Sequence, residues 1–154
     1  MAAFRAIRNR GLAAAGLGKT GVDATLAGDT LLLRGEAGER LDIPLASITR
    51  LRAGYEPNRY SGNLYQMRLW TSAAPRPLKL ATIHKDEADY AIIARAIAAT
   101  VERTHGPGAI EGGVGWLAAL IFPVWVILWF FFRPYRPRRL RCLSDLDRFL
   151  PRQD

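Results

Sequence analysis

The most constraining feature of the sequence is an apolar segment near its C-terminal end. Residues 112–132 read GGVGWLAALIFPVWVILWFFF and contain no charged residue, and the next nine residues, RPYRPRRLR, contain five arginines. At about 1.5 Å per residue, a helix of roughly 20 residues crosses the roughly 30 Å hydrocarbon core of a bilayer. The pattern therefore predicts one transmembrane helix over residues 113–132.

The residues beside this segment predict its orientation. Five arginines of the basic tail, residues 133–154, are interpreted as a topology signal that also attracts anionic lipids: Arg133, Arg136, Arg138, Arg139 and Arg141. The positive-inside rule places this tail in the cytoplasm. The N-terminal residues show no convincing signal peptide, so the side that carries the preceding domain stays open. Pro123 either kinks the span or turns it back as a hairpin.

The formal net charge of +8 is unevenly concentrated along the chain. Residues 1–111 carry 15 Lys and Arg against 11 Asp and Glu, whereas residues 112–154 carry seven against three. Basic charge next to an apolar segment is typical of a membrane flank, so nucleic acid is disfavoured as a partner. A single cysteine, Cys142, excludes an internal disulfide and cannot form a zinc site alone.

The region before the apolar segment has the pattern of a small β-rich domain that ends in a helix. Alternating apolar residues between turn-forming residues predict strands over residues 22–26, 30–34, 41–45, 48–53, 65–69 and 78–83. A helical apolar period, with acids at its start and Gly106-Pro107 after its end, predicts a helix over residues 86–104. Residues 1–18 are expected to form a short helix, and residues 106–112 a glycine-rich linker.

The stretch GDTLLLRGEAGERLDIPLASITRLRAG, residues 28–54, resembles the bacterial domains of the pleckstrin-homology (PH)-like family. A hairpin, a strand ending in Ile-Pro-Leu and a Ser-Ile lead into the next strand recur there, and the resemblance covers residues 20–105. It implies an α+β fold in which a small antiparallel β-barrel or sandwich of about six to seven strands is capped by one C-terminal helix. Together with the apolar segment, it predicts a single-pass protein of the bacterial inner membrane.

The resemblance does not extend to phosphoinositide recognition. Lipid-binding members of the family hold inositol phosphates with basic residues around the first hairpin, whereas the turn here is Gly28-Asp29, with Asp23 nearby.

No set of residues predicts catalysis, metal binding or a cofactor. The two histidines, His84 and His105, have no third ligand at metal-binding spacing. The Gly18-Lys19-Thr20 triplet does not form a phosphate-binding loop, because Ala13 stands where that motif requires glycine. We therefore expect a non-enzymatic protein.

A basic and aromatic surface is the candidate binding site for lipid or a partner protein. It is expected where the fourth and fifth strands pair around the loop at residues 54–63, and its members are Arg50, Arg52, Arg59, Arg68, Tyr55 and Tyr60. Such a surface binds anionic lipid headgroups or an acidic protein, and a solvated strand face is the alternative interpretation.

Two hypotheses for the function follow. The first is a membrane-anchored interaction module that binds lipid or a protein of unknown identity. The second is an accessory single-span subunit of a larger membrane enzyme or transporter complex, with Gly113, Gly115, Ala118 and Ala119 as a small-residue contact strip.

Overall fold

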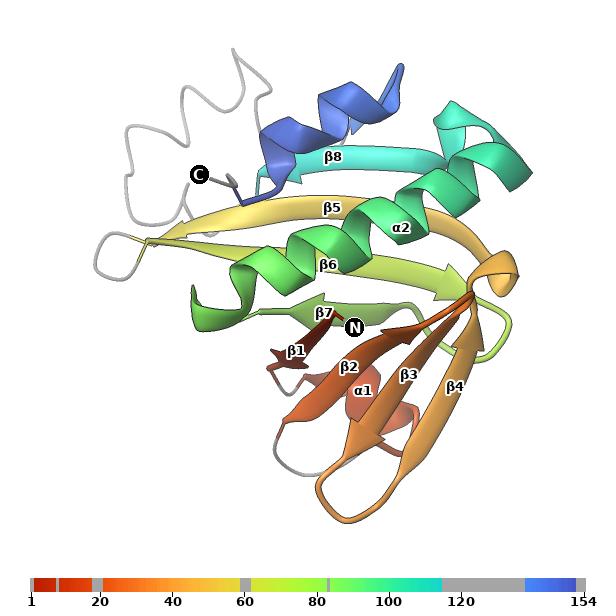
Figure 1. Cartoon of the computed structure of the whole chain (residues 1–154), viewed down its shortest axis with the longest axis vertical. Helices are drawn as coiled ribbons and strands as arrows, with labels where there is room; N and C mark the ends of the chain where they lie inside the picture. The colour runs from red at the N-terminus through yellow and green to blue at the C-terminus, as the bar shows by residue number, and fades with distance from the viewer. Residues whose placement is uncertain are drawn as a thin grey trace.

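The computed structural model describes residues 2–7, 9–17, 21–58, 62–82, 84–114 and 138–151. These residues form an α+β fold with two β-sheets and one long helix (Figure 1). The strands are β1 (Ala3–Ala6), β2 (Val22–Ala27), β3 (Thr30–Gly35), β4 (Arg40–Pro44), β5 (Ile48–Asn58), β6 (Gly62–Thr71), β7 (Leu78–Ala81), β8 (Ile110–Val114) and β9 (Arg138–Arg139). The α-helices are α1 (Arg10–Ala14) and α2 (Glu87–His105), and the 3-10 helices are η1 (Leu45–Ser47), η2 (His84–Asp86), η3 (Pro107–Ala109) and η4 (Leu143–Phe149).

The strands are divided between a four-stranded and a five-stranded sheet. The first sheet has the order β1-β2-β3-β4, and all its neighbouring strands are antiparallel. The second has the order β7-β6-β5-β8-β9, in which β5 and β8 are parallel and the other neighbours antiparallel. The N-terminal segment joins the two sheets, because Ala6 forms an isolated bridge with Thr82 and the Ile7 amide donates to the Ala81 carbonyl at 2.8 Å.

Turn chemistry explains the two hairpins of the first sheet. Gly28, with φ of 57°, lies between β2 and β3, and Gly38, with φ of 89°, lies between β3 and β4. Both are in the left-handed region that glycine adopts without steric cost. The alternation of the strands then places Leu31, Leu33 and Ile43 in the core.

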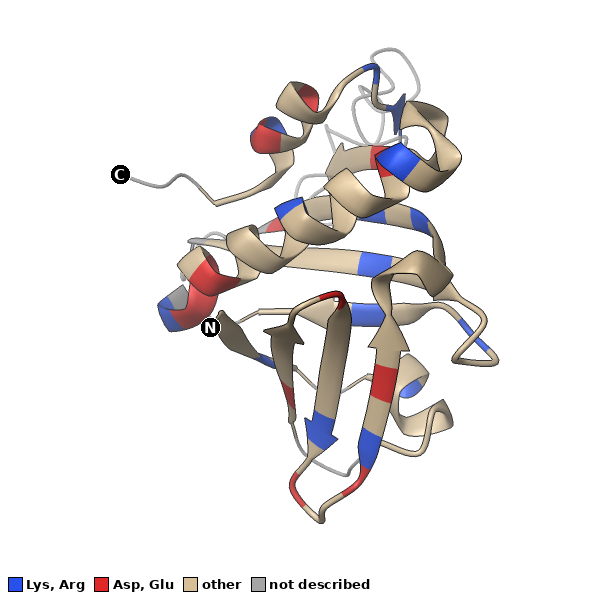
Figure 2. Ribbon diagram, turned by 45° about the vertical axis from the view of Figure 1, so that its right-hand side comes forward, with Lys and Arg blue, Asp and Glu red and all other residues tan. Residues whose placement is uncertain are grey.

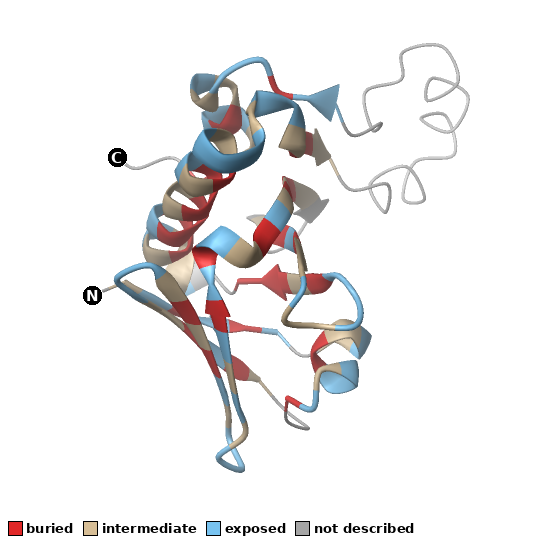
Figure 3. Cartoon of the chain, turned by 90° about the vertical axis from the view of Figure 1, so that its right-hand side faces the viewer, coloured by how far each residue is buried: buried red, intermediate tan, exposed pale blue. Residues whose placement is uncertain are grey.

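Helix α2 packs across the second sheet. Its buried face contains seven residues that recur at helical spacing: Tyr90, Ala91, Ile93, Ala94, Ile97, Ala98 and Val101. Figure 3 shows this buried stripe along the side of the helix that faces the strands. Opposite it, Leu51 and Ala53 of β5 and Met67 and Leu69 of β6 are also buried. Burying one Ile or Leu side chain contributes about 1.5–3 kcal/mol, so this interface is the centre of the core.

Residues 138–151 belong to the same fold. β9 pairs with β8, and Leu140, Leu146 and Leu150 are buried in the core. Arg95 of α2 and Asp147 of η4 form an ion pair at 3.0 Å. The C-terminal segment therefore docks beside α2 on the second sheet (Figure 1).

The predicted architecture needs correction. A barrel or sandwich of six to seven strands with one transmembrane helix is wrong, because the described residues contain nine strands in two sheets. Among those residues, no helix has the length and apolar character needed to cross a membrane. This finding contradicts the transmembrane helix and the single-pass inner-membrane location. Gly113 and Val114, predicted to begin the span, instead pair with β5 as part of β8.

The rest of the predicted span, residues 115–132, and Pro123 with it, lies outside the described residues. The accessory-subunit role itself stays a prediction, although the single span that it assumed belongs to the contradicted location. Of the predicted basic flank, Arg138 and Arg139 form β9 and Arg141 lies between β9 and η4, whereas Arg133 and Arg136 fall outside the described residues.

The six predicted strands and the predicted helix are present as β2–β7 and α2. β5 and β6 are longer than expected and include most of the predicted loop at residues 54–63. The N-terminal helix expected over residues 1–18 is replaced by β1 and the five-residue α1. The expected linker at residues 106–112 contains η3 and the start of β8.

Candidate binding face

One surface of the second sheet points away from α2 and gathers basic side chains. On β5 and β6, the residues between the buried positions face this side, because successive side chains of a strand point to opposite faces. We call this surface the basic face, and its members are Arg50, Arg52, Glu56, Gln66, Arg68, Trp70, Lys79, Glu111 and, opposite Glu111 in register, Arg139. Figure 2 shows basic residues on the neighbouring strands β5, β6 and β7.

Five charged residues of the basic face form a row across adjacent strands. The register places Lys79 of β7 opposite Arg68 of β6, Arg68 opposite Arg52 of β5, Arg52 opposite Glu111 of β8, and Glu111 opposite Arg139 of β9. Neighbouring strands are about 4.8 Å apart, so three cations lie in consecutive positions. Like charges directly opposite each other destabilise a sheet, and sheet stability therefore does not explain the row.

Glu111 is held by two arginines, Arg50 and Arg52, near the β9 end of this row. Its side chain is only 8% exposed. It accepts hydrogen bonds from Arg52 Nε at 2.8 Å and from Arg50 Nη2. Burial, the strongest influence, raises the pKa of Glu111, but the hydrogen bonds and charges of Arg52 and Arg50 together outweigh it and lower the pKa below its ordinary value. Glu111 is therefore ionised at neutral pH and fixes both guanidinium groups.

Trp70 supports the same two arginines from β6. The Cζ atoms of Arg50 and Arg52 lie 4.7 Å and 5.5 Å from its ring centroid. A cation–π contact at an exposed site contributes about 0.5–1 kcal/mol. The two side chains are thus ordered before any ligand arrives, which lowers the entropic cost of binding.

At the other end of the row, Lys79 has a carboxylate partner and Arg68 has none. Lys79 Nζ lies 3.5 Å from Glu56 Oε1, which also accepts a hydrogen bond from Gln66 Nε2 at 2.9 Å. Arg68 is exposed and forms no ion pair with any residue that the structure describes. Five cations (Arg50, Arg52, Arg68, Lys79 and Arg139) against two carboxylates (Glu56 and Glu111) give the basic face a net charge of 5 − 2 = +3.

The structure brings together three of the six predicted site residues, Arg50, Arg52 and Arg68. Tyr55 lies on the opposite side of the sheet, where its ring centroid is 5.8 Å from that of Tyr65 in the aromatic cluster beside α2. Arg59 and Tyr60 lie outside the described residues.

Sequence reasoning missed Trp70, Lys79 and Glu111. The alternation of β6 and β7 could have identified Trp70 and Lys79, because each occupies the same strand face as Arg68. Glu111 carried no such signal, since it lies in a glycine-rich stretch that pairs in parallel with a distant strand.

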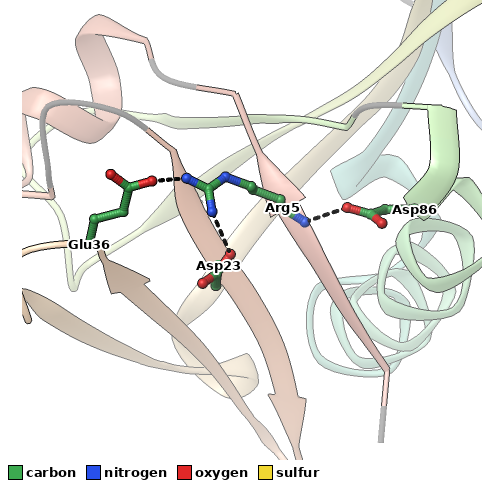
Figure 4. Close-up of polar contacts among 4 residues, drawn as sticks. All are labelled: Arg5, Asp23, Glu36 and Asp86. Atoms are coloured by element: carbon green, nitrogen blue, oxygen red, sulfur yellow. Dashed lines mark hydrogen bonds and ion pairs between the residues drawn. The ribbon is translucent and has the colours of Figure 1, made fainter.

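A second polar cluster surrounds Arg5 of β1 (Figure 4). Its guanidinium forms ion pairs with Glu36 and, at 3.9 Å, with Asp23, and its backbone amide donates to Asp86 Oδ2 at 3.0 Å. A Cβ atom at position 21 would lie 2.6 Å from Arg5 Nε, so a side chain there would displace the Arg5 guanidinium. These contacts tie β1 to the first sheet and to the start of α2, which is a structural role.

The two histidines are separated by the length of α2. His84 lies in η2 and His105 at the exposed end of α2. Over the described part of the chain, no group of three His, Cys, Asp or Glu residues is placed to hold a metal ion.

Comparison with known proteins gives no relative: no protein-family model matches the sequence, and no curated protein matches it. The resemblance to PH-like domains therefore stays a prediction.

Proposed function

We propose that this protein is a non-enzymatic interaction module that binds an acidic segment of a partner protein through the basic face. The observation that carries this proposal is the consecutive placement of Arg52, Arg68 and Lys79, with Arg68 lacking an ion-pair partner in the described structure. An acidic partner offsets the repulsion within this row.

The chemistry of the basic face supports binding. Guanidinium and ammonium groups donate charge-assisted hydrogen bonds to carboxylates, and these are roughly twice as strong as neutral ones. Arg52 is already oriented by Glu111 and Trp70, so less conformational entropy is lost when a ligand binds. The PH-like resemblance, which stays a prediction, is consistent with a binding role.

The surface favours a protein over a lipid bilayer or nucleic acid. Membrane-surface elements combine cations with apolar side chains that enter the bilayer. The large exposed apolar residues of the described chain are Ile7 and Ile92, and neither lies on the basic face. A nucleic-acid interface with about 6–10 phosphate contacts needs more free cations than the five of the basic face, which also has two internal carboxylates.

The test is a titration of a fluorescein-labelled decaglutamate peptide into the full chain, followed by fluorescence anisotropy. We expect saturable binding of the peptide. Its affinity should be at least fivefold lower for R68Q than for wild type, and within twofold of wild type for R103Q. Arg103 is exposed on α2, so R103Q removes the same charge from the other side of the sheet. A length-matched polyglutamine peptide is the ligand control.

Equal loss of affinity in R68Q and R103Q contradicts a specific basic face. Tighter, Arg68-dependent binding to phosphatidylglycerol vesicles or to single-stranded RNA than to decaglutamate also overturns the proposal.

A further inference from the structure

We infer that the basic face accepts a phosphoryl dianion on the partner protein, seated over Arg68 between Arg52 and Lys79. The inference rests on the proposed function and specifies the chemical group that is recognised.

The internal carboxylates favour a doubly charged ligand. Each cation beside Arg68 already has a carboxylate partner, Glu111 for Arg52 and Glu56 for Lys79. A ligand carboxylate carries one negative charge, the same as Glu111 or Glu56. It therefore has no electrostatic advantage over them as a partner for Arg52 or Lys79. A phosphoryl group carries about −1.5 to −2 charges at pH 7 and three strong acceptor oxygens, so it interacts more strongly with the net positive basic face than a carboxylate does.

The spacing of the row also fits one phosphoryl group. Arg52, Arg68 and Lys79 occupy three neighbouring strands and therefore span about 10 Å at their backbones. Side chains as long as Arg and Lys can reach one central anion from backbones this far apart. The guanidinium fork of Arg68 suits bidentate contact with two phosphoryl oxygens.

Free donors remain on the flanking residues. Arg52 uses Nε and Nη2 toward Glu111, which leaves the hydrogens of Nη1. Lys79 has three N–H donors and one carboxylate neighbour at 3.5 Å. A dianion over Arg68 thus gains contacts on both sides without displacing Glu111 or Glu56.

Three fluorescein-labelled peptides that differ only in their central residue test this inference: GGGXGGG with X as phosphoserine, glutamate or serine. We expect the phosphoserine peptide to bind the full chain at least tenfold more tightly than the glutamate peptide at equal ionic strength. R68Q should lose most of this preference, and R103Q should keep it. R68K keeps the positive charge but loses the bidentate guanidinium group. It should therefore reduce the preference for the phosphoserine peptide over the glutamate peptide to about threefold or less.

Two further ligands distinguish the source of the phosphoryl group. Inorganic phosphate should compete with the phosphoserine peptide only weakly, and phosphatidic acid vesicles should bind R68Q and wild type alike. Arg68-dependent vesicle binding without preference for the phosphoserine peptide overturns the assignment to a protein.

The outcome separates this inference from the proposed function. If decaglutamate binds through Arg68 but phosphoserine gives no advantage over glutamate, the phosphoryl inference is wrong and the proposed function stands. If neither decaglutamate nor the phosphoserine peptide binds through Arg68, both are wrong. Circular dichroism of each variant confirms that loss of binding is not loss of folding.

Discussion

The ring of Phe149 in η4 lies against the backbone of Gly112 in β8, at the place where a side chain would begin. A Cβ atom at position 112 would overlap three atoms of that ring. The absence of a side chain at this position thus permits the C-terminal segment to dock on the second sheet.

Gly112→Ala should therefore loosen the C-terminal segment. Overpacking at a close contact costs about 1–3 kcal/mol, and the ring of Phe149 is the group that must move. We expect faster amide hydrogen exchange over residues 138–151, with exchange in α2 little changed. Gly108→Ala is the matched control, because a Cβ there meets no atom within 4 Å.

A double variant separates this clash from a general loss of strand stability. G112A and F149A should be less than additive in unfolding free energy, since removing the ring removes the overlap. Additive losses would contradict the proposed role of the Gly112–Phe149 contact.

Arg68→Gln should weaken binding yet leave the fold as stable or more stable. Arg68 faces Arg52 and Lys79 in register, and removing one of these like charges relieves about 0.2–1 kcal/mol of repulsion per pair. Urea unfolding at low and high salt checks this, because screening should reduce the gain. A marked destabilisation by R68Q would show that the arginine is structural.

The local sequence was informative where local rules decide the structure. Alternation and turn glycines predicted β2, β3 and β4, and a 3.6-residue apolar period with terminal charges predicted α2. The same alternation placed Arg50, Arg52 and Arg68 on one surface. These features depend on residues close together in the chain.

The pairing of Gly112 with Arg138 had no such local signal. The apolar run beside these residues predicted a span by its length alone, and the two ends of a single span lie on opposite sides of a core roughly 30 Å thick. Residues that pair in one sheet cannot be separated in that way. Likewise, the parallel pairing that brings Glu111 to Arg52 joins strands far apart in the sequence. The sequence therefore could not show that this carboxylate lies on the basic face.

Tyr90→Phe should be neutral or stabilising. The Tyr90 side chain of α2 is fully buried against the rings of Phe4 and Tyr65, and its hydroxyl has no hydrogen-bond partner in the described structure. A buried polar group without a partner costs about 1–3 kcal/mol, so removing the oxygen recovers part of this cost. Thermal unfolding of Y90F measures the effect, with Y65F as the control at a half-buried tyrosine of the same cluster. A loss of stability in Y90F would indicate that the hydroxyl has a partner.

Burial, and secondarily the charge of Tyr65, raises the pKa of Tyr90 well above its ordinary value. Its phenol should therefore show no ultraviolet titration until the fold is lost at high pH. Titration of Tyr90 within the folded protein near pH 10, identified as a signal missing from Y90F, would contradict its burial.

Glu111→Gln should destabilise the protein near neutral pH by about 1–3 kcal/mol, because it removes charged hydrogen bonds to Arg50 and Arg52 from a nearly buried site. The pKa of Glu111 is lower in the folded protein than its ordinary value of 4.5. Its stabilising contribution is therefore fully present above about pH 4.5 and is lost as the pH falls through the folded pKa.

The difference in unfolding free energy between wild type and E111Q should thus be constant from pH 7 to pH 5 and shrink at lower pH. Urea unfolding at each pH measures this difference, and taking it between the two proteins cancels the other carboxylates. D42N is the control, because hydrogen bonding from Arg40 also lowers the pKa of Asp42, but on an exposed strand, where the effect should be smaller. A difference that persists unchanged at pH 3, or grows there, would show that Glu111 does not act through its charge on Arg50 and Arg52.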